Sequence, residues 1–347
     1  MPRRIVVVGG GAAGMSAASA ARRTDHEALI TVLESGPFPS YGVCGLPYYL
    51  GGVVESAESL VAYPASEFRD RRRIDLRLET SVDRIDLEGR VVVDAAGEHH
   101  PYDALVFAAG AAPVVPPIPG VDDPRVVTIR RLDDAIDLHA RLEGLDGRGE
   151  RVRSAAVVGA GYVGLEMAEA LHGRGIDVTV IDRLPRVMTT VDPVVADLVE
   201  EEVRRHCRLL LDAPLEAIVA DDTGLVLHCG VQGSGEAPEQ VGPVDLVVLA
   251  LGVRPATGLL PSLAALPNGA LLVDERGRTS DPHVFSAGDC AAVFHRVLGG
   301  PAYVPLGPAA NKAGRVAGTV AAGGDAEFAG VVGTAVVKVF DLAVAHT

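Results

Sequence analysis

Gly9-Gly-Gly-Ala-Ala-Gly14 lies between the apolar run Ile5–Val8 and the alanine-rich stretch Met15–Arg23. Such a run is typical of a strand buried in a parallel sheet, and such a stretch is typical of a helix. In a GxGxxG turn the first glycine permits the tight turn, the second lets a diphosphate approach, and the third lets helix and strand pack closely. The next apolar run, Ala28–Leu33, ends at Glu34, a carboxylate placed to accept hydrogen bonds from ribose hydroxyls. This stretch predicts a dinucleotide-binding unit.

The same layout occurs a second time. Ala155–Val158 leads into Gly159-Ala-Gly-Tyr-Val-Gly164, and the apolar run Asp177–Ile181 ends at Asp182. One such motif alone is compatible with an ordinary glycine-rich turn, but two, each with an acid at the expected distance, favour two dinucleotide sites. Later parts repeat as well, because Tyr102–Gly110 resembles Val244–Gly252. We therefore expect an α/β fold with two Rossmann-like domains.

Composition narrows the class of protein. A chain of 347 residues that is 48% hydrophobic and 22% charged is long enough for two or three compact domains. Its net charge of −15 argues against nucleic acid as a partner. No apolar stretch approaches the roughly 20 residues of a membrane span. The four cysteines form no CxxC pair and no metal-like spacing, so we expect reduced thiols, no bound metal and a cytoplasmic protein.

Two further motifs carry a resemblance to a known family. Ser286-Ala-Gly-Asp-Cys290, and Val304–Gly307 followed by Asn311–Arg315, resemble the FAD-dependent pyridine nucleotide-disulfide oxidoreductase superfamily. The resemblance implies that Asp289 holds the ribityl chain of FAD, although a helix N-cap is the alternative reading of this residue. It also implies that the first fold binds FAD and that the second binds NADH, with NADPH possible.

The same resemblance implies a domain layout. Residues 1–120 and 251–325 would form a discontinuous FAD-binding domain, with residues 121–250 inserted as the NAD(P)H-binding domain. Residues 326–347 would begin a C-terminal dimerisation domain of which most is absent, so we expect a truncated sequence or a protein that works without that domain. A homodimer is expected where the domain is present.

Ser40–Gly52 is the most informative segment for chemistry. It contains Cys44-Gly-Leu-Pro47, and the second cysteine of the two-cysteine branch is absent because Tyr49 stands in its place. This pattern resembles the single-cysteine branch, which contains coenzyme A-disulfide reductase, NADH oxidase, NADH peroxidase and persulfide reductase. Pro47 suits the first turn of a helix, which would put Cys44 at a helix N-terminus, where a thiolate is stabilised. The alternative is an inert packed thiol, the reading that we favour for Cys207, Cys229 and Cys290.

Within this branch the sequence favours a disulfide or persulfide substrate, with coenzyme A disulfide first. NADH peroxidases carry a histidine in the first glycine motif, where this chain has Ala12. Positions that match coenzyme A contacts in kind are Ser16, Arg23, Ser40 and Arg72. Ala20 and Val43 depart from the polar residues found in the well-known members. The basic stretch Phe68–Arg73 would bind coenzyme A phosphates or form a solvated helix end. NADH oxidase activity through a cysteine sulfenic acid, and a non-enzymatic redox sensor, are the alternatives.

Cys44 is the expected catalytic residue. The cofactor contacts that the motifs and the resemblance imply are Gly9, Gly11, Ala13, Gly14, Glu34, Ser35, Val82, Ala109, Gly110, Gly159, Gly161, Tyr162, Val163, Gly164, Glu166, Asp182, Arg183, Gly252, Asp289, Pro305 and Leu306. Asp182 favours NADH because a carboxylate repels a 2′-phosphate, and Arg183 and Arg186 would partly offset that repulsion.

Overall fold

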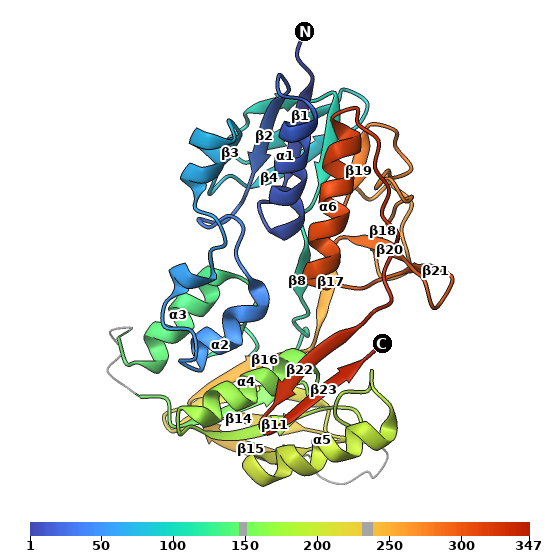
Figure 1. Cartoon of the computed structure of the whole chain (residues 1–347). Coiled ribbons are helices and arrows are strands. Elements are labelled where there is room, and N and C mark those ends of the chain that lie inside the picture. The colour runs from blue at the N-terminus through green and yellow to red at the C-terminus, as the bar shows by residue number, and fades with distance from the viewer. Residues whose placement is uncertain (146–150, 231–238) are drawn as a thin grey trace.

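The computed structural model describes residues 1–145, 151–230 and 239–347 and contains a five-stranded parallel sheet in each half of the molecule (Figure 1). The first sheet has the order β19-β7-β1-β2-β3, with bounds Val284–Ser286, Ala104–Phe107, Arg4–Val8, Leu29–Leu33 and Asp75–Arg77. The second has the order β12-β11-β10-β16-β9, with bounds Arg208–Leu210, Asp177–Ile181, Ser154–Val158, Leu246–Leu249 and Val126–Thr128. The expected α/β fold with two Rossmann-like domains is confirmed.

Each sheet places its glycine motif in the same position. The strand before the motif, β1 or β10, lies at the centre of its sheet, paired in parallel with the next strand on one side and with β7 or β16 on the other. The two sheets differ in the origin of the edge strand next to β7 or β16. In the first sheet this strand is β19, from late in the chain, and in the second it is β9, which precedes β10. Ligands of such folds bind at the carboxyl ends of the strands, so both motifs open onto a binding edge.

The helices and the smaller sheets complete the two halves. The helices are α1 Ala12–Thr24, α2 Leu46–Leu50, α3 Leu132–Leu142, α4 Tyr162–Gly173, α5 Pro193–His206 and α6 Gly307–Ala321, with short turns η1 Val43–Gly45, η2 Ala57–Leu60 and η3 Glu67–Arg71. The small antiparallel sheets are β4-β5-β6 (Val82–Asp86, Val91–Asp94, His99–Pro101), β13-β14-β15 (Leu215–Asp221, Gly224–Cys229, Glu239–Val244), β8-β17 (Ala111–Pro113, Val253–Pro255) and β22-β23 (Ala335–Val339, Leu342–His346). A further mixed sheet is β18-β20-β21 (Leu271–Leu272, Ala291–His295, Gly300–Ala302). Within the described ranges, no helix is long and apolar enough to cross a membrane.

Helices α1 and α6 pack in very close contact. A Cβ added at Gly314 would lie 2.3 Å from the Ala13 carbonyl oxygen, and one at Gly318 would lie 2.0 Å from the Ala17 carbonyl oxygen. Only glycine on α6 allows the two backbones to approach this closely. The small alanine side chains of α1 leave enough space for this contact. The contact holds the N-terminus of α6 beside the first glycine motif (Figure 1).

Two segments cross between the halves side by side. Strand β8 follows the first Rossmann sheet, strand β17 follows the second, and the two pair antiparallel with Ala111 opposite Pro255. They are the continuations of the two similar stretches that end at Gly110 and Gly252. The pair therefore connects corresponding edges of the two sheets.

The segment that contains Cys44 packs against the second half. Leu46, Tyr49 and Leu50 are buried in one core cluster with residues of α3, α4 and the second sheet. The hairpin β22–β23 joins the same cluster through Val337 and Val339 (Figure 1). Strand β22 pairs antiparallel with β23 in this hairpin.

Candidate functional site

The first glycine motif has the geometry that a bound diphosphate requires. Gly9 has a φ of +101°, and a Cβ there would lie 2.2 Å from the Ala108 carbonyl oxygen. A Cβ at Gly14 would lie 1.8 Å from the Gly9 carbonyl oxygen. Gly11, the N-cap of α1, has no atom within 4 Å of such a position, so the helix N-terminus faces open space. Free N–H groups and the helix dipole favour an anion there.

The second glycine motif repeats this geometry. Gly159 has a φ of +113°, and a Cβ there would lie 2.4 Å from the Ala250 carbonyl oxygen. A Cβ at Gly164 would lie 1.8 Å from the Gly159 carbonyl oxygen, while Gly161, the N-cap of α4, again faces open space. The structure therefore contains two helix N-termini suited to a dinucleotide diphosphate.

The acids at the ends of β2 and β11 are tied to their motifs in the same way. Glu34 Oε2 accepts from the Gly10 amide at 2.5 Å, and Asp182 Oδ2 accepts from the Ala160 amide at 2.6 Å. The second oxygen of each carboxylate accepts from the backbone two residues on, at 2.7 Å for Glu34 and 2.8 Å for Asp182. Glu34 Oε1 also accepts from Ser35 Oγ at 3.4 Å, and the other three oxygens each keep a further lone pair for a ribose hydroxyl.

Asp289 is not a helix N-cap, because β20 follows it almost at once. Its carboxylate forms an ion pair with Arg130 at 2.7 Å, and the Arg130 Nε donates to the Ala111 carbonyl oxygen at 3.0 Å. The turn before it lies between two helices, since a Cβ at Gly288 would lie 2.9 Å from the Cβ of Ala13 and 3.7 Å from that of Ala310. Asp289 therefore lies close to the N-termini of α1 and α6.

Arg130 and its neighbour Arg131 were missed by reasoning from the sequence. Arg131 donates to Ser35 Oγ at 3.3 Å, next to Glu34, and pairs with Asp133 at 2.9 Å. The sequence signal that could have identified them is a pair of adjacent arginines directly before a predicted helix, in a protein of net negative charge. With the open N-terminus of α1 and the Asp289 carboxylate, these cations fit a ligand that carries a diphosphate and several hydroxyls, as FAD does.

The remaining expected cofactor residues lie around these two centres. Ala109, Gly110 and Gly252 follow the carboxyl ends of β7 and β16. Val82 begins β4, two residues after Thr80, whose amide donates to the Glu34 carbonyl oxygen at 2.8 Å. Val163 lies at the N-terminus of α4, and Arg183 follows β11. Pro305 and Leu306 directly precede α6.

Cys44 lies in η1, directly before α2, and it is the exposed one among the four cysteines. Although the residue as a whole is exposed, partial burial of its thiol, together with Glu166 and Asp289, raises the pKa of Cys44, and Arg130 acts in the opposite direction. The expected position of Cys44 directly before a helix is confirmed, and its thiolate character stays a prediction. Burial and the two carboxylates act against the short helix α2, which has only five residues.

A group of titratable side chains extends from Cys44 along α4. Burial, together with Glu169, raises the pKa of Glu166 to about 7. Burial, together with the charges of Glu166 and Glu169, raises the pKa of the Tyr48 hydroxyl of α2. Lys338 of β22 forms an ion pair with Glu169. A carboxyl group that titrates near neutral pH beside a thiol is able to exchange protons with it.

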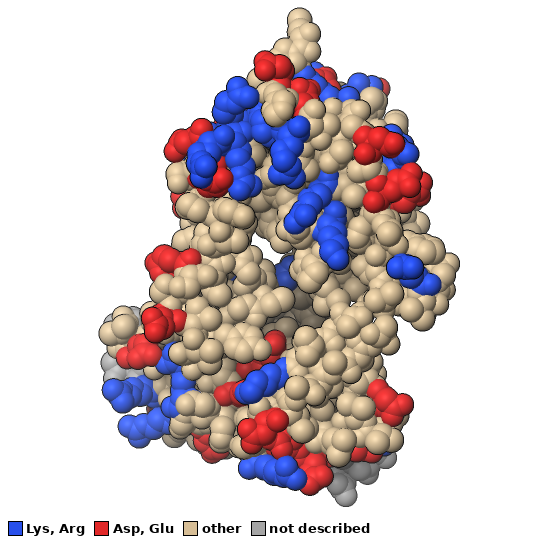
Figure 2. Space-filling view, in the orientation of Figure 1, with Lys and Arg blue, Asp and Glu red and all other residues tan. Residues whose placement is uncertain are grey.

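The four residues expected to contact coenzyme A lie in the first half, but their side chains differ in availability. Arg72 donates to Ser19 Oγ at 2.8 Å, pairs with Glu67 at 3.2 Å and covers the rings of Tyr63 and Phe68. Arg23 is exposed at the end of α1. Lys and Arg side chains gather on this face over α1 and β3 (Figure 2). The structure thus uses Arg72 internally and leaves Arg23 facing solvent.

Ser16 and Ser40 both have backbone or side-chain contacts of their own. Ser16 Oγ accepts from Asn311 Nδ2 of α6 at 2.8 Å. Ser40 has a φ of +52°, which is uncommon for a serine, and its amide donates to the Gly10 carbonyl oxygen at 2.8 Å. The strained Ser40 backbone joins the Cys44 segment to the first glycine motif.

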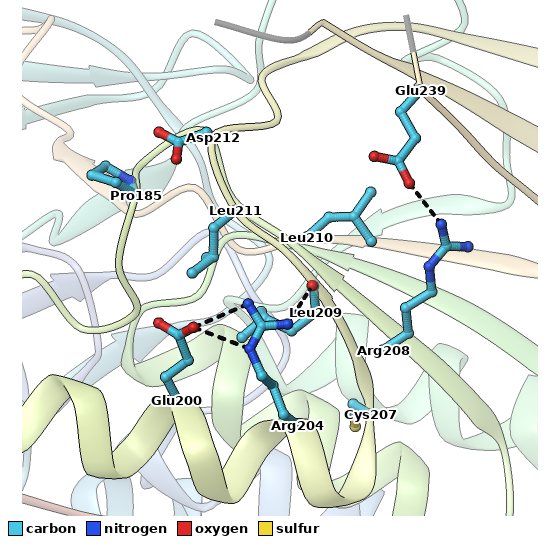
Figure 3. Close-up of a pocket in the computed structure, with 10 residues that line it drawn as sticks. All are labelled: Pro185, Glu200, Arg204, Cys207, Arg208, Leu209, Leu210, Leu211, Asp212 and Glu239. Carbon is cyan, nitrogen blue, oxygen red and sulfur yellow. Dashed lines mark hydrogen bonds and ion pairs between the residues drawn. The ribbon is translucent and has the colours of Figure 1, made fainter.

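An open hollow of about 840 Å³ lies away from this chemistry, along the outer edge of β12 (Figure 3). Its cations are already paired, Arg204 with Glu200 at 3.0 Å and Arg208 with Glu239 at 2.7 Å. Cys207 in its wall is buried, as are Cys229 and Cys290, and burial raises the pKa of the Cys207 thiol to about 12. The expected burial of these three cysteines is confirmed, and the hollow has no group set up for catalysis.

Comparison with known proteins agrees with these features. The family described as pyridine nucleotide-disulphide oxidoreductase matches residues 3–317. The chain is 37% identical over 323 residues to an NAD(P)H sulfur oxidoreductase (CoA-dependent) of Pyrococcus furiosus, covering 92% of this chain and 70% of that protein. It is 33% identical over 333 residues to an NADH oxidase of Methanocaldococcus jannaschii, covering 94% of this chain and 71% of the relative.

Among solved structures, an NAD-dependent persulfide reductase from A. fulgidus superposes with a TM-score of 0.89 at 38% sequence identity. The alignment covers 99% of this chain but 63% of that structure, so this chain spans less than two thirds of its length.

Proposed function

The chain belongs to the pyridine nucleotide-disulphide oxidoreductase family, and we propose that it carries electrons from NADH through FAD to Cys44, which reduces a low-molecular-weight disulfide or persulfide. Cys44 carries the proposal, because it is the exposed cysteine and the charges of Asp289 and Glu166 act on its thiol. Proteins of this family use FAD and NAD(P)H. The domain bounds given above, and a homodimer formed through a C-terminal domain, remain predictions.

FAD would be held by the first half. The N-terminus of α1 would take its diphosphate, Glu34 a ribose, and Asp289 with Arg130 the ribityl region. When bound, FAD accepts a hydride from NADH and passes on an electron pair. The nicotinamide nucleotide would lie on the N-terminus of α4, with Asp182 at its ribose and with Tyr162 and Glu166 toward the nicotinamide.

Cys44 would work as half of a disulfide that the substrate completes. Two electrons and one proton cleave the Cys44–S–S–R bond to give the Cys44 thiolate and R–SH. The thiolate then attacks R–S–S–R, which restores Cys44–S–S–R and releases R–S⁻, which takes up a proton. A chain without a second nearby cysteine needs this arrangement, because no internal thiol resolves the mixed disulfide.

Glu166 would supply the protons. Its pKa of about 7 leaves a mixture of acid and carboxylate at neutral pH, so it is able to give a proton to a departing thiolate and recover one from solvent. The raised pKa of Cys44 makes such a partner useful, because a Cys44 thiolate that takes up a proton must lose it again before it attacks the disulfide.

Coenzyme A disulfide is the substrate that we favour. The cations over α1 and η3 suit its phosphates, and the chain's 37%-identical relative from Pyrococcus furiosus carries "CoA-dependent" in its name. Arg23 would be the main contact, since Arg72 is engaged by Glu67 and Ser19. We expect Arg23→Ala to raise KM for coenzyme A disulfide about tenfold and leave KM for cystine unchanged. Arg208→Ala, distant and paired with Glu239, is the matched control.

The decisive measurement is the intact mass of the denatured, unreduced protein before and after dithiothreitol. A reducible adduct of coenzyme A size that is lost in Cys44→Ser and kept in Cys207→Ser would support the proposal. Cys44→Ser should abolish disulfide reduction and leave flavin reduction by NADH intact. Full disulfide activity of the serine variant would make Cys44 structural.

Oxygen is the second candidate acceptor, favoured by the likeness to an NADH oxidase. In that case Cys44 would cycle through a sulfenic acid. An unmodified mass, trapping of Cys44 by dimedone and rapid NADH consumption in air without a disulfide would replace the first proposal with this one.

NADH is the proposed nucleotide. Asp182 would repel a 2′-phosphate, and Arg186 is engaged by Asp197, which leaves Arg183 to offset the repulsion. Asp182→Ala should shift the ratio of kcat/KM toward NADPH by about tenfold. A wild-type protein that prefers NADPH tenfold would contradict the assignment.

A further inference from the structure

The hairpin β22–β23 is anchored to two helices of the second half by its turn. The Phe340 amide donates to Glu169 of α4 at 2.8 Å, and the Asp341 amide donates to Glu202 of α5 at 3.1 Å. The Phe340 ring stacks on His206 with centroids 4.3 Å apart. These contacts hold both ends of the turn, so the strand that follows has a defined position over α4.

That strand ends in a contact with the second glycine motif. Nε2 of His346 in β23 is hydrogen-bonded to the hydroxyl of Tyr162, the first residue of α4. Thr190, in the loop after β11, donates to the same hydroxyl at 3.2 Å. Tyr162 is therefore held by two side chains from different elements, one of them 184 residues away along the chain.

The donors and acceptors of this network are consistent. Thr190 donates to the Tyr162 hydroxyl oxygen, and the same hydroxyl shares a second hydrogen bond with Nε2 of His346, whose direction follows the histidine tautomer. Two hydrogen bonds on one hydroxyl restrict both side-chain torsions of the tyrosine. The ring cannot turn freely while the hairpin is docked.

Tyr162 is the first residue of α4, at the helix N-terminus proposed above to bind the nicotinamide nucleotide. It follows Gly161 directly and precedes Glu166 by one helical turn, so both side chains lie on the same face of α4. On the function proposed above, the nicotinamide lies against this face, between α4 and Cys44.

We propose that His346 is a positioning residue for the nicotinamide nucleotide. From the hairpin it fixes Tyr162 in advance in the orientation that the bound nucleotide needs. Ordering a free tyrosine side chain on binding would otherwise reduce affinity roughly two- to tenfold. The inference rests on the proposed nucleotide site and adds a role for β23 that the glycine motif does not contain.

The test measures NAD⁺ binding to the FAD-loaded protein by calorimetry, with the rate of flavin reduction by NADH as a second readout. His346→Ala and Tyr162→Phe should each weaken NAD⁺ binding about three- to tenfold. The double variant should bind no more weakly than either single variant, because both remove the same hydrogen bond. His346→Gln, whose amide oxygen replaces Nε2, should recover most of the affinity, while the limiting rate stays within about twofold.

Thr334→Ala is the matched control, because it removes the 2.8 Å contact between Thr334 and Thr347 at the same end of the hairpin without touching Tyr162. Thermal unfolding checks that each variant is folded. NAD⁺ affinity of His346→Ala within twofold of wild type, or independent losses in the double variant, would overturn the inference. Wild-type protein that does not bind NAD⁺ would instead refute the proposed function itself.

Discussion

The two glycine motifs have nearly the same backbone and different neighbours. Gly9 and Gly159 make the same left-handed turn, but the positions that hold Ala12 and Ser16 in the first motif hold Tyr162 and Glu166 in the second. In the first half α6 packs directly on α1, so small side chains are required. In the second half that face of α4 meets α2 and the hairpin, and large polar groups are accommodated. The glycines therefore indicate a dinucleotide site. The side chains at the other positions of the motif and the helix reflect which element packs on that helix.

The largest effect should come from breaking one motif at a time. Gly9→Ala places a Cβ 2.2 Å from the Ala108 carbonyl oxygen at a φ of +101°. We expect FAD affinity to fall on the order of a hundredfold or more, from backbone strain and overlap. Gly159→Ala should keep its FAD and lose reduction by NADH to a similar degree. Flavin absorbance of the purified proteins and titration with NADH would measure both, and equal loss of FAD in the two variants would contradict separate sites.

The next effect concerns stability and compares a glycine in the tightly packed helix α6 with one in α4. Gly318→Ala should destabilise the protein by about 2 to 3 kcal/mol, because the added Cβ would lie 2.0 Å from the Ala17 carbonyl oxygen. Gly173→Ala is the control in α4, where a Cβ meets nothing within 4 Å, and should be neutral or stabilising by up to about 1 kcal/mol. Urea unfolding measures both. Similar stabilities would mean that α1 and α6 do not need their close contact.

A smaller effect separates the arginine proposed for the FAD site from the one proposed for the nucleotide site. Arg130→Ala leaves the Asp289 carboxylate without its 2.7 Å partner and should weaken FAD binding about tenfold, with no change in the preference between NADH and NADPH. Arg183→Ala should leave FAD affinity unchanged and lower use of NADPH. Fluorescence titration with FAD and kcat/KM for both nucleotides give the two readouts. Arg183→Ala weakening FAD as much as Arg130→Ala would contradict the assignment of each arginine to its own cofactor site.

The smallest effect concerns pH. The pKa of Glu166 in the folded protein is raised from 4.5 to about 7, so its protonated form favours folding. That contribution is complete below pH 4.5 and is lost as the pH rises through about 7. We expect the Tm of Glu166→Gln to fall less than that of wild type between pH 5 and 8, by a difference on the order of 2 °C, because solvent screens part of the effect. Ser16→Ala, at the matching place in α1, should follow the wild-type pH slope; a parallel slope for Glu166→Gln would show that this carboxyl is not perturbed.

Much of the fold and part of the site could be predicted because they depend on short-range rules. Each strand, glycine turn, helix and terminal acid lies within about thirty residues, and the contacts among them are backbone contacts that glycine and chain direction impose. The burial of Cys207, Cys229 and Cys290 and the exposure of Cys44 also agree with the sequence pattern. The raised pKa of the Cys44 thiol could not be predicted, because it depends on burial and on the charges of Glu166 and Asp289, which come from distant parts of the chain.

The sequence by itself determined the two Rossmann-like halves, their order and the family, because a tight turn, a buried strand and an acid at its end are local requirements that only certain residues meet. Tertiary structure alone decided the partners of those motifs. Arg130 meets Asp289 across 159 residues, and Tyr162 meets His346 across 184. Such pairs leave no periodicity or spacing in the chain, since a side-chain contact between distant segments depends on how the sheets, helices and hairpin pack together.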